Sequence, residues 1–308
     1  MSIHIFANIV TDFGTAANNR GETEGNTTTL QKLIWHGGVH TTVSAEAIRF
    51  AARQAMATME DAGTNRTFDE KLRVNTWQDP AFEGWADKKK AKTFIDDDVL
   101  GYMRADAAKE EGKAGTATVR RAVLEVTRAV SLTPWSGDTT FNAASPGATP
   151  SAAKKGKDPK VSNPVPYGAE IHATRYQYGV AMTPERLQDP SRAAKALKAL
   201  VELRSVAGNH GRFLFDFTPA SVVFRVTDDP APRLLYCFET NDEGQTVDAQ
   251  ELLRRVKSGD IDAGELIVGG QLSGSNTGQA LKEAGADVHE GIKAATAAVL
   301  ERIESAIA

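Results

Sequence analysis

The hydrophobic positions along the chain follow strand-like and helix-like periods in turn. Residues 3–10 are apolar or β-branched at almost every position, which predicts a central strand buried on most of both faces. Ser44 is a typical N-cap residue, and apolar residues recur at helical spacing from there to about residue 60. Alternating apolar residues predict strands over residues 119–132 and 169–182, and a second helical stripe follows over residues 191–206.

The rest of the pattern completes one α+β domain. Two or three further strands are expected, over residues 212–217, 221–226 and 233–239. Two helices, near residues 249–256 and 287–307, make residues 240–308 a helical C-terminal extension. The core order of strand, helix, strand, strand, helix, strand is that of the ferredoxin-like fold, which RRM domains also use. We therefore expect residues 1–308 to form a single RRM-like domain.

Two irregular segments interrupt this core. Residues 61–115 mix aromatic residues with a run of three lysines and the run Asp96-Asp97-Asp98, and we expect an insertion there. Residues 137–168 hold five prolines and four lysines, which predicts an exposed basic arm. On the strand that follows, Tyr176 and Tyr178 fit either a platform for stacking bases or the core, and core packing is favoured.

Composition narrows the class of protein. The chain has 308 residues and a mass of 33.0 kDa, with 41% apolar and 25% charged residues, so it is typical of a soluble globular protein. No apolar run is long enough to cross a membrane. The first residues lack a signal-peptide pattern, and the single cysteine, Cys237, excludes an intrachain disulfide. We expect a cytoplasmic protein with no membrane partner.

The net charge of −4 is the sum of two unequal parts. Residues 239–308 carry 13 acidic and 6 basic residues, a net charge of −7, whereas residues 1–238 carry 30 basic and 27 acidic residues, a net charge of +3. Phosphate binding needs only a local basic surface, so the overall sign does not exclude a nucleic-acid partner.

The motifs of common enzymes and metal sites are missing from the sequence. There is no G-x-S-x-G, no Walker A motif and no G-x-G-x-x-G after a strand. His36 and His40 lie four apart around two glycines, which favours a loop over a zinc site. The aspartate run 96–98 is more typical of solvated or helix-capping residues than of a Mg²⁺ site. We expect no catalytic residue, no metal and no cofactor.

Candidate binding residues gather in a polar loop and the helix after it. Asn and Arg side chains beside glycine present donors on a backbone that can approach sugar and phosphate oxygens. A solvated loop with two surface arginines explains the same spacing, so the residues alone leave both interpretations open. The candidates of the loop and helix are Asn18, Asn19, Arg20, Asn26, Lys32, His40, Ser44, Arg49 and Arg53. The basic arm adds Lys154, Lys155, Lys157 and Lys160, and Arg212 is a further candidate.

Several of these residues lie in motifs that resemble a known family. Residues 17–22 (ANNRGE), 25–26 (GN), 29–32 (TLQK), His40 and 43–49 (VSAEAIR) are similar to the N-terminal signature of the DevR-type backbone subunit of type I CRISPR Cascade complexes, in the Cas-seven superfamily. Residues 178–184 (YGVAMTP) and 208–212 (GNHGR) also look like family motifs. The matched motifs span most of the core but exclude the two insertions.

The resemblance implies a fold and a function. It implies an RRM-like palm, a finger at residues 61–115 and a thumb at residues 137–168. It also implies a non-enzymatic subunit that polymerises along the CRISPR RNA spacer and leaves the bases free to pair with target DNA in antiviral defence. Asn19, Arg20, Arg49 and Arg53 would then hold guide phosphates. The implied partners are CRISPR RNA, target DNA, further copies in a helical filament and the large, guide-end-capping and guide-processing subunits of Cascade.

Two other functions stay open at this stage. Backbone subunits of type III complexes cut target RNA with a loop aspartate, and Asp12 is the nearest candidate by position. The DevR name suggests a duplex-DNA-binding regulator, although no helix-turn-helix pattern stands out. Incubation of the guide-loaded assembly with complementary RNA, and competition by duplex DNA, separate these functions from a scaffold.

Overall fold

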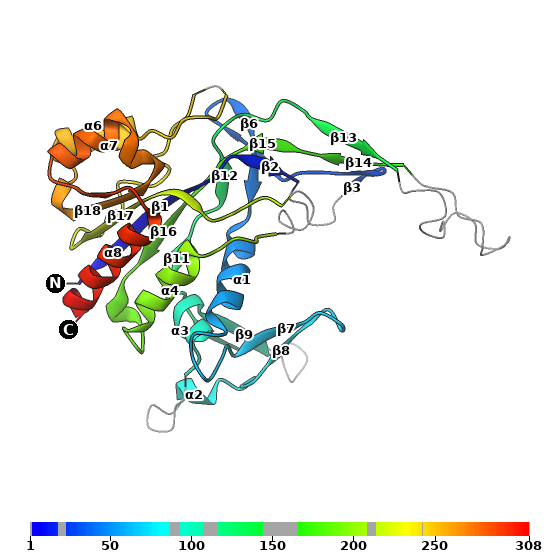
Figure 1. Ribbon diagram of the computed structural model, residues 1–308. Helices are drawn as coiled ribbons and strands as arrows, with labels where there is room; N and C mark the ends of the chain where they lie inside the picture. Colours follow the sequence, from blue (N-terminus) through cyan, green and yellow to red (C-terminus); the bar gives the residue numbers. More distant parts are fainter. Residues whose placement is uncertain are drawn as a thin grey trace.

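A computed structural model describes residues 2–17, 23–86, 93–106, 116–143, 166–207, 214–241 and 243–307. Its main sheet has nine strands (Figure 1). In spatial order they are β19 (Asp287–His289), β18 (Leu266–Gly270), β17 (Pro219–Thr227), β1 (His4–Thr11), β16 (Tyr176–Met182), β12 (Ala129–Ser131), β6 (Gly38–Val43) and β5 (Lys32–Trp35), with β11 (Glu125–Val126) also paired to β16. The chain is thus a mixed α/β structure built on one large sheet.

The expected strand and helix order lies at the centre of this sheet. Strands β17, β1, β16 and β12 lie side by side in this order, and each strand is antiparallel to its neighbour. Helix α1 (Ala45–Met56) follows β1 along the chain, and helix α4 (Arg192–Val201) follows β16. The Ser44 hydroxyl accepts a hydrogen bond from the backbone of Ala47, which confirms the predicted N-cap.

Helices cover both faces of the sheet (Figure 1). On one face α1, α4 and α8 (Ile292–Ile307) pack on Ile5, Ala7 and Ile9 of β1. On the other face α6 (Gln250–Lys257) and α7 (Asn276–Glu283) pack with Phe6 and Val10. The alternation of side chains along one strand therefore feeds two cores, as the almost continuous apolar run of residues 3–10 predicts.

The two central tyrosines belong to the core. Tyr176 and Tyr178 are fully buried, and their rings lie 6.4 Å and 5.6 Å from that of Phe217. Burial raises the pKa of both phenols. The core interpretation is confirmed, and neither ring is available to stack on a base.

The first insertion contains more regular structure than its sequence indicates. It holds the hairpin of β7 (Arg66–Asp69) with β8 (Val74–Trp77), the strand β9 (Tyr102–Asp106) and the helices α2 (Glu83–Ala86) and α3 (Ile95–Leu100). Strand β9 pairs with β10 (Thr116–Arg120), just after the insertion, and the pairs β7–β8 and β9–β10 are called the inserted hairpins below. Phe82 stacks on Tyr102 with ring centroids 3.8 Å apart, and Trp77 meets Phe82 edge-on at 5.5 Å. A small aromatic core thus joins the two hairpins to each other.

The second insertion begins and ends in paired strands. Strand β13 (Thr139–Asn142) pairs with β14 (Tyr167–Glu170), which also pairs with β4 (Thr27–Thr28) beside β3 (Thr23–Glu24). These four strands are called the arm below (Figure 1). Strand β2 (Gly14–Ala16) pairs with β15 (His172–Thr174) near its base, so the segment 11–29 is not a loop throughout. Lysines 154, 155, 157 and 160 lie outside the described residues.

Two of the predicted strands are broken because their residues serve several sheets. Within residues 119–132, the backbone N–H groups of Val123 and Leu124 donate to the carbonyl oxygen of Val99. The chain therefore leaves the hairpin partner β9 there and joins β16 only afterwards, through β11 and β12. Residues 169–182 likewise divide into β14, β15 and β16, each in a different sheet.

The strand predicted at residues 233–239 is wrong, and side chains supply the reason. Asn8 accepts a hydrogen bond from the backbone of Tyr236, and Gln177 both accepts from and donates to the backbone of Phe238. These buried amides take the backbone groups that a neighbouring strand would otherwise bind. Of the strand predicted at 212–217, residues 214–217 are described and form no strand.

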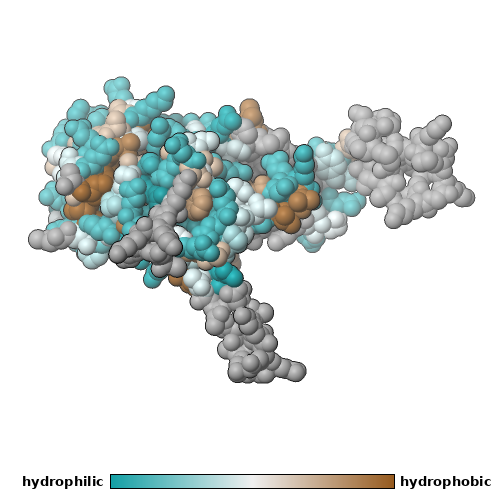
Figure 2. Space-filling view, turned by 90° about the horizontal axis from the view of Figure 1, so that it is seen from below, coloured by the Kyte–Doolittle hydropathy of each residue, from teal (hydrophilic) through white to brown (hydrophobic). Residues whose placement is uncertain are grey.

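The C-terminal region contributes strands as well as helices. Residues 240–307, expected to be helical, add β18 and β19 to the edge of the main sheet. No helix among the described residues is long and apolar enough to span a membrane. The face seen in Figure 2 is largely hydrophilic, with separate hydrophobic patches. Exposed large apolar side chains stand on the inserted hairpins, on β5 and β6 and on the arm, among them Leu72, Met103, Val119, Ile34 and Phe141.

Candidate nucleic-acid interface

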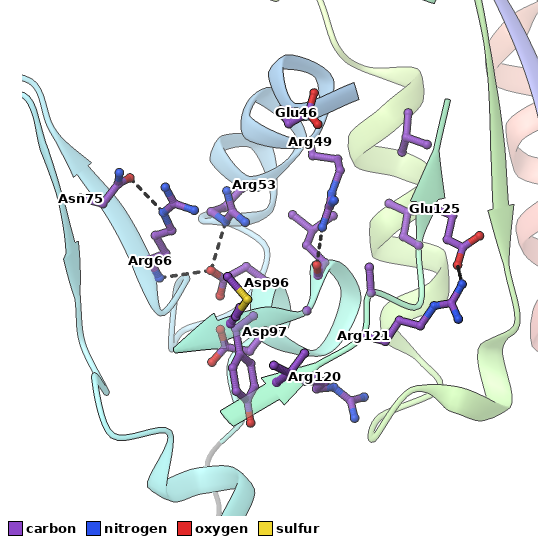
Figure 3. A pocket seen from close by; sticks show the side chains of 18 of the residues that line it. Glu46, Arg49, Arg53, Arg66, Asn75, Asp96, Asp97, Arg120, Arg121 and Glu125 are labelled. Atoms are coloured by element: carbon purple, nitrogen blue, oxygen red, sulfur yellow. Dashed lines mark hydrogen bonds and ion pairs between the residues drawn. The ribbon is translucent and has the colours of Figure 1, made fainter. Parts of the chain in front are cut away.

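A pocket of about 880 Å³ lies between helix α1 and the inserted hairpins (Figure 3). Five arginines line it, and we call it the arginine pocket: Arg49, Arg53, Arg66, Arg120 and Arg121. Its lining also includes the apolar side chains of Trp77, Met103 and Val119, of which the last two face each other across the β9–β10 pair. The lining thus combines cationic and apolar side chains.

Helix α1 places two of the arginines. Ile48, Ala51, Ala52 and Met56 are buried against the core, so Arg49 and Arg53, four residues apart, fall together on the side that faces the inserted hairpins. Arg49 Nη2 donates to the carbonyl oxygen of Leu100. Arg53 Nε lies 3.3 Å from Asp96 Oδ2, in an ion pair whose side chains are 14% and 2% exposed. The spacing of four residues along α1 thus places both arginines on one face of the helix, beside the pocket.

The other three arginines come from the inserted hairpins and the segment after them. Arg66 Nε donates to Asn75 Oδ1 across the β7–β8 hairpin, and the guanidinium lies 5.5 Å from the Trp77 ring centroid. Arg120 Nη2 lies 2.6 Å from Asp98 Oδ1, and its guanidinium stacks over the Trp85 ring at 4.2 Å. Arg121 stays 77% exposed in a pair with Glu125.

Two of these arginines keep buried donors that make no hydrogen bond. Among the described residues, the buried Nε atoms of Arg49 and Arg120 have no hydrogen-bond partner, whereas Arg53 Nε meets Asp96 in the ion pair alone, without the geometry of a hydrogen bond. Burial lowers the pKa of the Arg53 guanidinium, against the opposing effect of Asp96. Buried donors without an acceptor are unfavourable, so this wall suits an anion that brings oxygen atoms to the guanidinium groups.

The aspartate run is a buried structural element rather than a solvated one. Asp96, Asp97 and Asp98 form the first turn of α3, and each is at most 2% exposed. Burial, followed by the neighbouring charge of Asp96, raises the pKa of Asp97 to about 7. Within the described part of the chain, no three His, Cys, Asp or Glu side chains are placed to hold a metal ion. Of the expected alternatives, a solvated run is wrong, whereas residues at the start of a helix agree with the structure.

The other predicted residues that the structure describes do not line this pocket. Asn18, Asn19, Arg20 and Arg212 lie outside the described residues, and Asn26 is exposed in the turn between β3 and β4. Lys32 Nζ binds Glu170 at 2.7 Å and lies 4.2 Å from the Trp135 ring centroid. Lys32 therefore ties β5 to the arm, on a different part of the molecule from α1.

His40 and Ser44 serve the interior of the fold. His40 is 6% exposed, and its Nδ1 lies 2.7 Å from the carbonyl oxygen of Ser131. Ser44 is 3% exposed and caps α1. Neither side chain reaches the surface on which a backbone phosphate would lie.

Asp12 is held by two neighbours. Its Oδ1 lies 3.4 Å from Arg175 Nη1 and accepts a hydrogen bond from Gln271 Nε2 at 3.0 Å. Arg175 is buried and also donates to the carbonyl oxygens of Thr11 and Gly244. Asp12 thus takes part in a contact between β1, β16 and the C-terminal region.

Sequence reasoning missed Arg66, Arg120 and Arg121. Arg66 lies in a segment without regular hydrophobic period, and Arg120 and Arg121 lie at the start of the strand predicted at residues 119–132. Their distance from Arg49 and Arg53 along the chain hides their proximity. The sequence held one indirect signal: cationic residues in an insertion that follows the helix carrying Arg49 and Arg53.

Comparisons with known proteins show the family to which the chain is similar. Residues 11–258 match the protein family described as CRISPR-associated negative auto-regulator DevR/Csa2. A protein of Myxococcus xanthus (strain DK1622), named CRISPR-associated protein Cas7/Cst2/DevR, is 60% identical over 305 residues, which cover 99% of both chains.

Two solved structures have a similar fold. One is a chain of a CRISPR RNA-guided surveillance complex in a pre-nicking state, with a TM-score of 0.54 and 12% identity, covering 97% of this chain and 100% of that one. The other is a chain of a CRISPR RNA-guided surveillance complex, with a TM-score of 0.56 and 13% identity, covering 97% and 99%. At this level of identity the likeness concerns the fold.

Proposed function

Because the chain belongs to the DevR/Csa2 family of CRISPR-associated proteins, we propose that it is a non-enzymatic subunit that grips a guide RNA by its sugar-phosphate backbone in a type I Cascade effector. The family membership agrees with the resemblance found in the sequence motifs. The arginine pocket is the observation that carries the proposal: five arginines from helix α1, the β7–β8 hairpin and the end of β10 converge on a pocket of about 880 Å³.

The composition of the pocket favours backbone contacts over base recognition. Guanidinium groups bind phosphate oxygens through paired N–H donors, and such contacts carry no sequence information. A guide carrier must accept any spacer and leave the base edges free for pairing. The buried Tyr176 and Tyr178 support the same reading, because the strand that carries them offers no aromatic platform for bases.

The strand order supports an RRM-like palm in this proposal. In this proposal the four central strands and the helices α1 and α4 form the palm, the inserted hairpins form the finger, and the thumb is the insertion of residues 137–168, of which β13 and β14 are described. The arginine pocket then lies between palm and finger. The guide backbone would lie against α1 rather than on the sheet, whose other face is covered near β1 and β17 by α6 and α7.

Assembly follows from the same proposal. Further copies of the subunit would bind along one guide, together with the large, guide-end-capping and guide-processing subunits, and the guide would pair with target DNA. The acidic region of residues 239–308, with a net charge of −7, would face the more basic body of a neighbouring copy. The test reverses the charges of Glu301 and Glu304. If assembly length and its salt sensitivity stay unchanged, this contact is contradicted.

The binding experiment compares guide affinity over a range of salt concentrations. The double variant Arg49→Ala, Arg53→Ala should bind repeat-flanked spacer RNAs of different sequence with equally reduced affinity. Loss of two phosphate contacts should lower the slope of log K against log salt by about 1.4 for a single strand. A loss confined to some spacer sequences, or an unchanged slope, would contradict backbone gripping.

A matched control removes two cations from another helix. Arg254 and Lys257 lie on α6, at the opposite face of the sheet, and both are exposed. The variant Arg254→Ala, Lys257→Ala changes the net charge by the same amount as the arginine pair. It should leave guide affinity within about twofold of wild type if the arginine pocket, and not overall charge, holds the RNA.

A further inference from the structure

We propose that Asp96 is a positioning residue that sets the guanidinium of Arg53 and the strand of Arg66 for anion binding, an inference that rests on the proposed function of the arginine pocket. Asp96 lies on α3, whereas Arg53 lies on α1 and Arg66 begins β7. A single buried carboxylate thus joins three elements at the wall of the pocket (Figure 3).

Each oxygen of the carboxylate is engaged. Oδ1 accepts the backbone N–H of Asn65 at 2.7 Å, and Oδ2 accepts the backbone N–H of Arg66 at 3.1 Å. Oδ2 also lies 3.3 Å from Arg53 Nε. The two backbone contacts fix where the β7–β8 hairpin starts, and the ion pair fixes the arginine opposite it. The width of the pocket and the orientation of Arg53 therefore depend on one side chain.

Asp96 lines the pocket but exposes little of its surface to it. Asp96 is 1% exposed, whereas the side chain of Arg53 keeps 14% of its surface exposed. The contact with Asp96 involves Arg53 Nε, and a guanidinium has five N–H donors in a planar fork, so donors remain for a phosphate. The carboxylate thus holds Arg53 through one donor and leaves the others to an anion.

The neighbouring aspartate provides a contrast in the same turn of helix. Asp97 Oδ2 accepts the side-chain amide of Asn65 at 2.8 Å and has no ion pair with an arginine of the described pocket wall. Substitution to asparagine keeps an acceptor for that amide. Asp97→Asn therefore removes a buried carboxylate from α3 without releasing Arg53 or the backbone of Arg66.

The test is a double-variant cycle measured by guide-RNA binding. Asp96→Asn leaves one acceptor oxygen for three donors, so Arg53 loses its anchor, and affinity should fall about tenfold. In that background Arg53→Ala should lower guide affinity by less than a further twofold, because an unanchored Arg53 no longer contributes to binding. Asp97→Asn should bind within twofold of wild type. Unchanged or tighter binding by Asp96→Asn, or a full additional loss from Arg53→Ala, would refute the positioning role.

A second variant keeps the test decisive if Asp96→Asn fails to fold. Arg53→Lys preserves the positive charge and leaves Asp96 in place, but it removes the planar fork that the carboxylate orients. On a logarithmic scale, the guide affinity of Arg53→Lys should fall by at least half as much as that of Arg53→Ala. Wild-type affinity in Arg53→Lys would overturn the inference. Failure of the proposed function is distinguishable, since Arg49→Ala, Arg53→Ala would then leave guide binding unchanged.

Discussion

Arg192 and Asp98 form a buried ion pair, with Arg192 Nη1 3.0 Å from Asp98 Oδ2 and side chains 6% and 0% exposed. The pair links helix α4 to helix α3, and Asp98 also accepts hydrogen bonds from Arg120 and from the backbone of Gln188 and Asp189. It therefore fastens the inserted hairpins to the helical face of the sheet, next to the arginine pocket.

Loss of Arg192 should be strongly destabilising. Arg192→Ala leaves the buried carboxylate of Asp98 without its closest cation on α4, and we expect a loss of about 3–5 kcal/mol in the free energy of unfolding. Urea denaturation measures this loss. Lys195 on the same helix binds Glu60 but stays 35% exposed, so Lys195→Ala should cost less than about 1 kcal/mol. Equal effects of the two variants would contradict the role of burial.

The pKa of Asp97 predicts a stability that falls with rising pH. Burial, together with the charge of Asp96, raises this pKa to about 7 in the folded state, while the ordinary value is 3.8. The folded protein therefore binds the proton of Asp97 more tightly than the unfolded chain does. The resulting contribution to the free energy of unfolding is present at low pH and is lost as pH rises through 7.

Asp97→Asn isolates this effect. The stability of the variant relative to wild type should increase between pH 5 and pH 7, by up to about 1.4 kcal/mol per pH unit, and level off above pH 8. Unfolding midpoints of the variant and of wild type at a series of pH values measure the difference in stability. The contributions of other titrating groups cancel in this difference. A difference that is independent of pH would mean that Asp97 is ionised throughout.

His172 should act in the opposite direction. It is 4% exposed and lies between Thr41 Oγ1, 2.7 Å from Nδ1, and Thr133 Oγ1, 3.3 Å from Nε2. Burial lowers its pKa to about 4 from 6.5, so the unfolded chain takes up the proton first. Stability is present above pH 6.5 and lost as pH falls through 4. His172→Gln should reduce the acid sensitivity of the unfolding midpoint between pH 6.5 and 4, and an unchanged slope would argue against a buried neutral ring.

Gly101 occupies a position that no other residue can take without rearrangement. It ends α3 with φ of +67°, and a Cβ there would lie 2.3 Å from the carbonyl oxygen of Arg120. Gly259 has a similar φ of +79° but open space around it. Gly259→Ala should cost about 1 kcal/mol from backbone conformation alone, whereas Gly101→Ala should cost at least about 2 kcal/mol more. Thermal unfolding of the two variants tests this difference.

The scaffold function predicts an absence of RNA cleavage. Asp12 binds Arg175 and Gln271, and we expect guide-loaded protein to leave complementary RNA intact in the presence of Mg²⁺. Asp12→Ala should therefore change no product pattern on a denaturing gel. Cleavage by wild type that disappears in Asp12→Ala would instead identify an RNA-cleaving backbone subunit.

The sequence predicted well those elements whose hydrophobic period faces the same structural neighbours from one end of the element to the other. The strand at residues 4–11 and the helix that Ser44 caps agree with their patterns, because the strand lies between β16 and β17 along its length and the helix buries one face along its length. The segments 119–132 and 169–182 have the right composition for strands but pass between sheets, so their breaks at Val123 and Ile171 depend on distant partners.

By itself, the sequence determined the strand and helix order, the capped helix and the shared face of Arg49 and Arg53, because these depend on neighbours within a few residues. The tertiary structure decided what surrounds that face. It brought Arg66, Arg120 and Arg121 to the same pocket and buried His40. It also buried the aspartate run, in which Asp96 and Asp98 pair with two arginines of the pocket. Such placements arise from contacts between residues far apart in the chain, which no local pattern encodes.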